Sequence, residues 1–375
     1  MNDKELGGKV IDFRRYLHRI PETGNNLPKT RAFLETHLEA LDCEIRDFGP
    51  EGFTAWFECA EDKAAPCIAF RTDMDALPIT EDTGLEFASE HQGCMHACGH
   101  DGHMGILLGL ASWIDGNMGK LAKNVLLVFQ ASEETTGGAR DLIAEGIFEE
   151  HRPERIYGLH LWPGYPLGVI ASKPGGIMAG TCLARITAKG RSAHIANFKE
   201  GRDALYAASL FLNRAYEWGQ GIQGKAPHLL RFGAFHSGTA NNVVAGLALL
   251  EGTVRSYADE TSDMVKDGMK RIAGEIEQET EVSFDFYFES GYPPVVNDPE
   301  AYAEAKARLI SEGFSWFEMT EAALYAEDFA FYQQEIPGVY FHLGTGIDAE
   351  LHTTDYMIDE DALLTGVRLF RSLIF

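Results

Sequence analysis

Short apolar runs and helical stretches alternate along the N-terminal part of the chain. The runs are typical of buried strands and stand at Cys67–Arg71, Asn124–Gln130 and Arg155–His160. Apolar positions at helical spacing mark the stretches before and between them, at Leu6–Arg19, Pro28–Leu41, His103–Ile114 and Gly138–Gly146. Strands that alternate with helices in this way predict a layered α/β domain.

The pattern changes from about Thr181 onward. Strand, helix, strand, strand (or hairpin), helix and strand are predicted in turn, at Ala184–Ala188, Arg202–Trp218, Leu229–Phe235, Val243–Tyr257, Glu260–Thr280 and Val282–Phe288. This order is that of a ferredoxin-like α+β sandwich. Gly291-Tyr-Pro-Pro294 ends the sandwich, and the α/β pattern then returns, at Pro299–Glu312, Gly338–Gly344 and Asp359–Leu373. We therefore predict one α/β domain built from 1–181 and 293–375, with 182–292 inserted into it.

Length, charge and cysteine usage narrow the classes of function. A chain of 375 residues is too long for one ordinary core, so two domains are expected. The net charge is −25 and no run of lysine or arginine stands out, which argues against nucleic acid or an anionic membrane surface as partner. No apolar run reaches the ~18 residues of a spanning helix. The scattered cysteines and the charged N-terminal stretch predict a reducing, cytoplasmic setting.

One stretch, Gly93–His103, concentrates possible metal ligands. It packs two cysteines and three histidines into eleven residues, separated by small or flexible ones. Thiolate and imidazole suit Zn²⁺ and other late first-row divalent ions, and the glycines allow a tight backbone fold. The residues alone leave open whether His96, His100 or His103 binds an ion. They also leave open a plain glycine-rich turn with an inert cysteine and solvated histidines.

Polar side chains follow the predicted strands at their C-terminal ends. They are Asp73 and Asp75 after the first, Glu133 and Glu134 after the second, His160 at the end of the third, and His352 after the last. In open α/β sheets, sites form at the carboxyl ends of strands, so these residues are expected to converge with the stretch around Cys98. Each of these residues taken alone is weaker evidence for a site. Two adjacent glutamates are commonly solvated, and a single histidine is commonly a hydrogen-bonded residue of the core.

Combined, these residues form a mixed set of cysteine, histidine and glutamate ligands. Such a set is able to hold two ions a few ångströms apart with a bridging thiolate, lower the pKa of a bound water towards ~7 and polarise a carbonyl. A free glutamate beside the ions would take the proton from that water and deliver it to a leaving nitrogen. The predicted chemistry is metal-assisted amide hydrolysis, and Mn²⁺, Zn²⁺, Co²⁺ and Ni²⁺ all suit the ligands.

A series of short motifs extends over nearly the whole chain. They are Arg71–Ile79, Met95–His103, Phe129–Glu134 with Gly137–Ala139, Gly158–His160, Ser192–His194, Asn242–Val243, Gly252–Arg255, Ala326–Phe329 and Leu351–His352. In this order they resemble the M20 metallopeptidase family, and within it the amidohydrolase branch of aminoacylases, hippurate hydrolases and N-acetyl-diaminopimelate deacetylases.

The resemblance implies a zinc-peptidase-like α/β catalytic domain, whose inserted domain is a lid that also joins two chains into a homodimer. It implies that Cys98 bridges two ions, and the other implied ligands are His100, Glu134, His160 and His352. Glu133 would be the general base, and Asp75 would support the ligands from behind.

The resemblance also points to residues of the insert. His194 would stabilise the tetrahedral oxyanion, either in its own subunit or in the neighbouring one. Asn242 and Arg255 are candidates for substrate binding, and Arg255 is suited to a carboxylate; a surface strand residue is the alternative for Arg255. The sequence departs from the branch after this histidine, where a proline is usual and the chain reads His194-Ile-Ala-Asn197.

The predicted function is therefore cleavage of the amide bond of N-acyl amino acids or short peptides by a cytoplasmic dinuclear amidohydrolase. Within the family, the alternative is N-acetyl-diaminopimelate deacetylation in lysine biosynthesis. Two alternatives lie outside it: a metal-stabilised binding protein, and a thiol redox sensor built on Cys94 and Cys98. The expected partners are a small-molecule substrate and a second copy of the chain, with neither nucleic acid nor membrane.

Overall fold

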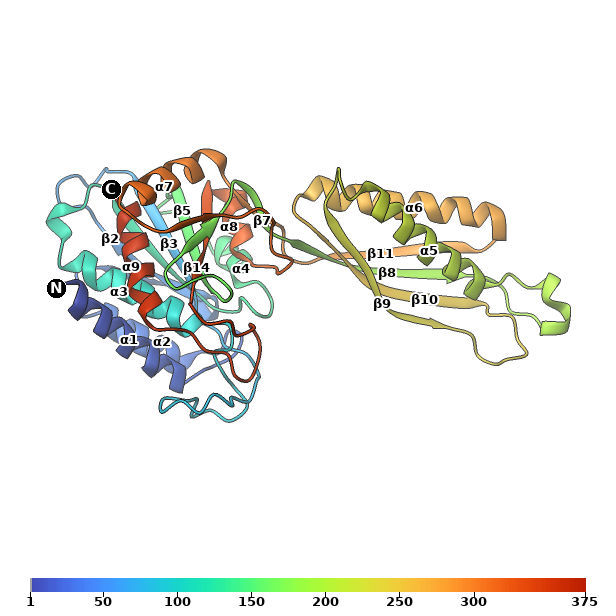
Figure 1. Cartoon of the computed structure of the whole chain (residues 1–375), viewed down its shortest axis with the longest axis horizontal. Coiled ribbons are helices and arrows are strands. Elements are labelled where there is room, and N and C mark those ends of the chain that lie inside the picture. Colours follow the sequence, from blue (N-terminus) through green and yellow to red (C-terminus); the bar gives the residue numbers. More distant parts are fainter. Residues whose placement is uncertain (1) are drawn as a thin grey trace. The chain divides into compact units, whose positions relative to one another are not determined.

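The computed structural model describes residues 2–375, which form two compact units. The first comprises the described chain up to Ile177 together with Val296–Glu321 and Asp328–Phe375. The second comprises Met178–Val295 and Ala322–Glu327. The C-terminal end labelled in Figure 1 belongs to the first unit.

The first unit is built on an eight-stranded mixed sheet with the strand order β1-β2-β4-β3-β5-β14-β6-β13. Its strands are β1 (Glu44–Asp47), β2 (Gly52–Phe57), β3 (Cys67–Asp73), β4 (Asn124–Gln130), β5 (Arg155–Trp162), β6 (Ile170–Ser172), β13 (Trp316–Glu318) and β14 (Gly338–Gly344). The central strands β4, β3, β5 and β14 run parallel. Every residue of β3, β4 and β14 is buried. Burial on both faces explains why these strands are continuous apolar runs in the sequence.

Helices cover both faces of this sheet. The helix α3 (His100–Asp115) packs with α1 (Asp3–Arg19), α2 (Pro28–Leu38) and α9 (Asp361–Leu373). The helix α7 (Pro299–Ser311) packs against α9. A separate pair is formed by α4 (Gly138–Ala144) and α8 (Phe329–Glu335). In β5, Leu161 lies against Gly102 of α3, whereas Gly158 lies against Phe329 of α8. Because successive side chains of a strand point to opposite faces, α3 and α8 lie on opposite sides of the sheet.

The second unit is an antiparallel sheet covered by two helices. Its elements are β8 (Gly180–Lys189), α5 (Ala204–Ile222), β9 (His228–Ser237), β10 (Leu247–Ser256), α6 (Asp259–Thr280) and β11 (Ser283–Ser290). The strand order is β11-β8-β10-β9, and α5 and α6 lie together on one face (Figure 1). Buried and less buried residues alternate along β8, as expected for a sheet covered on one face. The observed β-α-β-β-α-β order confirms the predicted fold class.

Several short elements complete the fold. The strands β7 (Gly175–Met178) and β12 (Val295–Asn297) pair with each other, and 3-10 turns occupy Gly49–Glu51, Met118–Lys120 and Ile195–Glu200. The sequence-based prediction contains no element at β1, β2, β6, β13 or α8. Of these, β1, β6 and β13 have only three or four residues, too few for a hydrophobic period. Among residues 2–375, no helix combines the length and the apolar character that a membrane crossing requires.

The start of α3 differs from the sequence-based prediction. The pattern predicts a helix from His103, whereas α3 begins at His100. Gly99 precedes it with a φ of 85°, a left-handed conformation that glycine adopts without the usual Cβ penalty. A Cβ at this position would also lie 2.9 Å from Tyr356 Oη. His100 and His103 therefore lie about one turn apart on the same helix.

The second unit also includes Ala322–Glu327, a segment that the sequence groups with the C-terminal part of the α/β domain. The chain leaves the first unit and returns to it twice, since Asp328 belongs to the first unit again. The domain boundaries at 182 and 292, and the role of the insert as a lid, stay predictions.

Candidate metal centre

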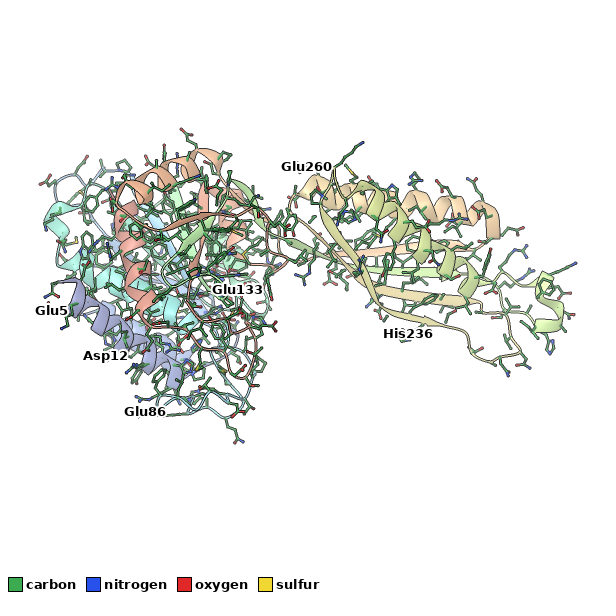
Figure 2. All side chains as sticks on the ribbon, viewed as in Figure 1. Glu5, Asp12, Glu86, Glu133, His236 and Glu260 are labelled. Carbon is green, nitrogen blue, oxygen red and sulfur yellow. The ribbon has the colours of Figure 1, made fainter. Side chains whose placement is uncertain are left out.

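The predicted ligands come from the carboxyl ends of the central parallel strands. Asp73 ends β3, Glu133 and Glu134 follow β4, His160 lies near the end of β5, and His352 follows β14; Cys98 lies between β3 and α3. Parallel strands bring their carboxyl ends to one edge of the sheet, so residues far apart in the chain meet there. In Figure 2, Glu133 lies within the first unit, whereas the exposed Glu5 points outward from it.

Two groups of possible ligands share the thiol of Cys98. Its Sγ lies 3.3 Å from His160 Nε2 and 3.3 Å from His352 Nε2. One group joins Cys98 to His100 and His160, the other joins it to Glu134 and His352, and the ligand atoms of each group lie within 4.8 Å of one another. Such separations suit ligands around one divalent ion, whose bonds are about 2.0–2.3 Å long. The geometry thus offers two neighbouring metal positions with one shared thiolate.

Hydrogen bonds set the tautomers of two of these imidazoles. The Nδ1–H of His100 donates to the backbone oxygen of Asp75 (2.7 Å), and the Nδ1–H of His160 donates to the backbone oxygen of Leu161 (2.9 Å). Because a carbonyl only accepts, the ring proton is on Nδ1 and Nε2 keeps its lone pair. His100 Nε2 is buried without a hydrogen-bond partner. An unpaired buried nitrogen with a free lone pair fits a metal ligand.

Asp75 holds the paired glutamates by their backbone. Its Oδ1 accepts the N–H of Glu133 (2.9 Å), and its Oδ2 accepts the N–H of Glu134 (3.0 Å). The preceding Ser132 has a φ of 60°, a left-handed conformation that costs a non-glycine residue about 1–2 kcal/mol. The strained turn and the two hydrogen bonds together determine where the glutamate side chains begin.

His352 is the accessible member of the set, with a side chain that is 44% exposed. It also adopts a left-handed conformation, with a φ of 63°, and its N–H donates to the backbone oxygen of Ala97 (2.9 Å). Its Nε2 lies 3.1 Å from Glu134 Oε1, and this carboxylate raises the pKa of His352. The exposed side of the site therefore lies at this histidine.

Negative groups dominate this edge of the sheet. Burial, followed by the Glu134 and Glu133 carboxylates, raises the pKa of the Cys98 thiol well above its ordinary value. Burial likewise raises the pKa of Asp75. A divalent cation would supply the positive charge that a thiolate among buried carboxylates requires. The charges, together with the unpaired His100 nitrogen, therefore fit a site for divalent ions.

The structure distinguishes His96, His100 and His103, among which the sequence alone leaves the choice of metal ligand open. Only His100 joins a group with Cys98 among the described residues. Both ring nitrogens of His103 already have partners, Asp73 Oδ1 at 2.7 Å from Nδ1 and the N–H of Leu161 at 2.9 Å from Nε2. His96 has no hydrogen-bond partner at either ring nitrogen and belongs to none of the ligand groups found in residues 2–375.

The other predicted residues lie in the second unit. The backbone of His194 pairs with that of Val243, and the N–H of Ile195 donates to the backbone oxygen of Asn242 (2.9 Å), so His194 and Asn242 are neighbours. Both are exposed. Arg255 lies at the far end of β10, where its Nη1–H donates to the backbone oxygen of Leu324 (2.7 Å). About 25 Å of strand separates Arg255 from the end of β10 nearer to Asn242.

Sequence reasoning assigned no role to three buried polar residues behind the ligands, Arg71, Gln130 and Asp328. Arg71 donates to all three of Gln130 Oε1 (2.9 Å), Asp73 Oδ2 (2.7 Å) and Asp328 Oδ1 (2.6 Å). Each of the three lies in one of the motifs quoted above, which is one available signal. A charged residue within an apolar run such as Cys67–Arg71 is another, because a buried charge requires a partner.

Comparison with known proteins identifies the family. The family model for peptidase family M20/M25/M40 matches residues 69–375. The chain belongs to this family. N-acetyldiaminopimelate deacetylases from Listeria monocytogenes serotype 4b and Streptococcus uberis are 36% and 35% identical to the M20 chain; the matches cover 95% and 94% of it, and 95% of each relative.

Solved structures agree with this assignment. The crystal structure of a dinuclear metal-binding peptidase of the M20 family from Bacillus subtilis matches the M20 chain with a TM-score of 0.87 and 31% identity, over 99% of this chain and 98% of that one. A crystal structure from methicillin-resistant Staphylococcus aureus matches with a TM-score of 0.91 and 27% identity, over 99% and 97%. The predicted family and fold class are confirmed. As a member of a peptidase family, the M20 chain is a hydrolase of amide bonds.

Proposed function

We propose that this M20 chain hydrolyses the amide bond of N-acyl amino acids, releasing a carboxylate and a free amino acid. The observation that carries the proposal is the pair of ligand groups that share Cys98, with Glu133 beside them. Family membership supports the reaction type.

We infer that two divalent ions bind here, held by Cys98, His100, Glu134, His160 and His352. When bound, Mn²⁺, Zn²⁺, Co²⁺ or Ni²⁺ would polarise the substrate carbonyl and lower the pKa of the attacking water. The unpaired Nε2 of His100 and the raised pKa of the Cys98 thiol support this inference. The related Bacillus subtilis protein, described as dinuclear, supports the number of ions.

Glu133 is the proposed general base. Its side chain is buried, its N–H is held by Asp75, and one of its carboxylate oxygens lies within 4.8 Å of ligand atoms of both His100 and Glu134. From this position it would accept a proton from the attacking water and deliver it to the leaving nitrogen. Glu134 would meanwhile remain a ligand.

His194 is the proposed donor to the oxyanion. The N–H of Ala196 donates to its Nδ1 (3.2 Å), so the neutral ring carries its proton on Nε2 and offers an N–H to substrate. The neighbouring Asn242 offers an amide to polar substrate groups. Arg255 lies too far along β10 to contact the same small molecule within one subunit. It would bind the substrate carboxylate only if Arg255 and His194 come from different subunits.

The substitution Glu133→Gln tests the mechanism, because it keeps the size of the side chain and removes the base. We expect an unchanged metal content and a turnover lowered about 10³-fold. The measurement is amine release from N-acetyl and N-benzoyl amino acids by protein loaded with Mn²⁺ or Zn²⁺, with a chelated control. A fully active variant would contradict the role of Glu133. Absence of metal-dependent release by the unmodified chain would instead favour a metal-stabilised binding protein.

The second candidate is N-acetyl-diaminopimelate deacetylation. The observation that favours it is the name of the relatives that are 35–36% identical over nearly the whole chain. Adding N-acetyl-diaminopimelate to the same substrate panel separates the two candidates. A sharp preference for it would establish the second, whereas broad cleavage of other N-acyl amino acids would exclude it.

We also propose that two copies of the chain associate through the second unit. The strand β9 lies at the edge of its sheet, where backbone groups are open to pairing with another strand. Large apolar side chains are exposed in segments next to His194, namely Ile195, Phe198, Leu205, Tyr206 and Leu247. A chain that sediments as a monomer at micromolar concentration would contradict this proposal.

The proposed setting is the reducing cytoplasm. All of the cysteines of the chain are free, and burial raises the pKa of Cys67 to about 12, so this thiol reacts slowly. Recovery of the native protein in a secreted or periplasmic fraction would contradict the proposal.

A further inference from the structure

His103 lies between two of the proposed metal-binding imidazoles. Its ring centroid is 5.3 Å from that of His100 and 4.8 Å from that of His160. Its Nδ1 lies 2.7 Å from Asp73 Oδ1, and its Nε2 lies 2.9 Å from the backbone nitrogen of Leu161. The residue is 3% exposed. A buried histidine with both nitrogens bonded this closely is fixed in place.

The two partners also determine the tautomer of His103. The N–H of Leu161 is a donor, so Nε2 accepts and the ring proton lies on Nδ1, where the carboxylate of Asp73 accepts it. The lone pair of Nε2 is therefore used by the backbone and is not free for an ion. Leu161 directly follows His160, so the bond acts on the backbone that carries a proposed ligand.

We propose that His103 is a positioning residue of the metal centre. It holds the backbone of His160 through Leu161 and packs against the ring of His100, so that both Nε2 atoms stay directed toward Cys98. The proposal rests on the proposed function, because it presupposes ions at this site. Partners of this kind, which orient ligands without touching the ion, typically control metal affinity.

A chain of buried hydrogen bonds fixes His103 from behind. Arg71 donates from Nη1 to Asp73 Oδ2 (2.7 Å) and from Nη2 to Asp328 Oδ1 (2.6 Å). Asp328 Oδ2 in turn accepts the N–H of Ala139 (3.1 Å), in the first turn of α4. The side chains of Arg71, Asp73 and Asp328 are at most 1% exposed. The bonds therefore link the backbone beside His160 to the backbone that follows the glutamate pair.

The hydrogen bond from Ala139 to Asp328 explains why the two preceding positions in the sequence are glycines. Gly137 has a φ of 81°, which favours glycine. Gly138 passes so close to Ala131 that a Cβ would lie 2.0 Å from its backbone oxygen. Only a chain without side chains at these positions brings the N–H of Ala139 to Asp328.

Three substitutions of His103 separate positioning by hydrogen bonds from mere packing. His103→Phe keeps a ring and loses both hydrogen bonds. His103→Asn keeps a donor for Asp73 but does not reach Leu161. His103→Gln has the length to offer an acceptor to Leu161 and a donor to Asp73. The readouts are metal affinity by competition with a chelator, bound metal per chain, and the absorption spectrum of the Co²⁺-loaded protein.

We expect His103→Phe and His103→Asn to bind metal about 10–100-fold more weakly than the unmodified chain, with an altered Co²⁺ spectrum. We expect His103→Gln to recover part of the lost affinity. These readouts need no substrate, so they do not depend on which amide the enzyme cleaves.

His342 supplies a matched control. It is buried, pairs with His160 across the neighbouring strand β14, and has no hydrogen-bond partner at either ring nitrogen. His342→Phe therefore removes no hydrogen bond, and we expect an unchanged metal affinity. An equal loss in this control would show that any ring change in these strands weakens the site, and would overturn the proposal.

Unchanged affinity and spectrum in His103→Phe would overturn the positioning role, because packing alone would then suffice. Loss of one ion from all three variants would identify His103 as a ligand and would overturn it as well. If circular dichroism shows that His103→Phe is unfolded, equal affinities of the Asn and Gln variants overturn the proposal. An unmodified chain that binds no divalent ion would instead overturn the proposed function.

Discussion

The proposed metal centre of the first unit and the His194 region of the second are built in opposite ways. In the first, Cys98, His100 and His160 are at most 7% exposed, and backbone oxygens hold the two imidazoles. In the second, His194 and Asn242 are exposed, His194 at the start of the 3-10 turn Ile195–Glu200 and Asn242 in the loop between β9 and β10. Buried hydrogen bonds hold the proposed ligands in place in advance of any ion, whereas exposed side chains gain a defined position from the molecule that they meet.

The strands that carry the two regions explain this contrast. Each residue of β4 is buried, so the polar groups at its end lie between two helix layers and need partners. Along β8 the burial alternates, and one face of that sheet is free of helices. A mechanism that uses both regions would therefore depend on a rigid half and an adaptable half.

Removing the shared thiol should produce the largest effect. Cys98 belongs to both ligand groups, so Cys98→Ala removes a ligand from each proposed ion at once. We expect loss of both ions and a kcat/KM lowered at least about 10³-fold. Metal analysis by mass spectrometry and amine release measure the two consequences.

Cys94→Ala is the control, because Cys94 lies in the same loop and joins no ligand group within residues 2–375. We expect activity and metal content near those of the unmodified chain. Equal damage from both substitutions would support the thiol redox alternative.

Changing the exposed histidine should produce an intermediate effect. We expect His194→Ala to lower kcat about 10²-fold while metal content and thermal stability stay unchanged, because the residue is exposed and belongs to the second unit, whereas the proposed ligands belong to the first. Loss of bound metal in this variant would contradict the contrast between the two regions, since it would show that His194 helps to hold the metal centre.

Coexpression of His194→Ala with Glu133→Gln extends this test to the dimer. If His194 serves the neighbouring subunit, each mixed dimer contains one site with both residues intact, and random pairing restores about a quarter of the activity. If His194 serves its own subunit, every site lacks one of the two residues and no activity returns.

Substitution of two carboxylates outside the proposed site, Glu81 and Glu279, should produce the smallest effect, a change in the free energy of unfolding. Burial alone would raise the pKa of Glu81 in the first unit, but hydrogen bonds from His18, Thr83 and Ser89 lower it to about 2. In the second unit, a hydrogen bond from Arg214 lowers the pKa of the exposed Glu279. A carboxyl group with a lowered pKa stabilises the fold above its unfolded pKa, and this contribution is lost as the pH falls through the folded value.

We therefore expect Glu81→Gln to lower the free energy of unfolding at pH 7 by about 1–3 kcal/mol. The difference should shrink as the pH falls from about 4.5 to about 2. Glu279→Gln should have no measurable effect in moderate salt, because exposed ion pairs are screened. Urea unfolding of metal-free protein at several pH values measures both. A pH-independent cost for Glu81→Gln would contradict the role of its charge.

Local patterns in the sequence were sufficient to predict much of the fold. The buried strands β3, β4, β5 and β14 were visible as apolar runs, because burial on both faces removes the alternation of polar and apolar positions. The β-α-β-β-α-β order of the second unit was visible for a similar reason, since periods of helix and strand are local properties. The series of motifs predicted the family, and the comparisons confirm it.

Only the tertiary structure decided which side chains meet and in which protonation form. His100 and His103 are the same residue type one helical turn apart, and their sequence neighbours do not distinguish them. One keeps a free Nε2 because its Nδ1 meets the backbone of Asp75, and the other loses it to the N–H of Leu161. These partners lie far away in the chain. The choice between ligand and support therefore depends on long-range hydrogen bonds that no local pattern contains.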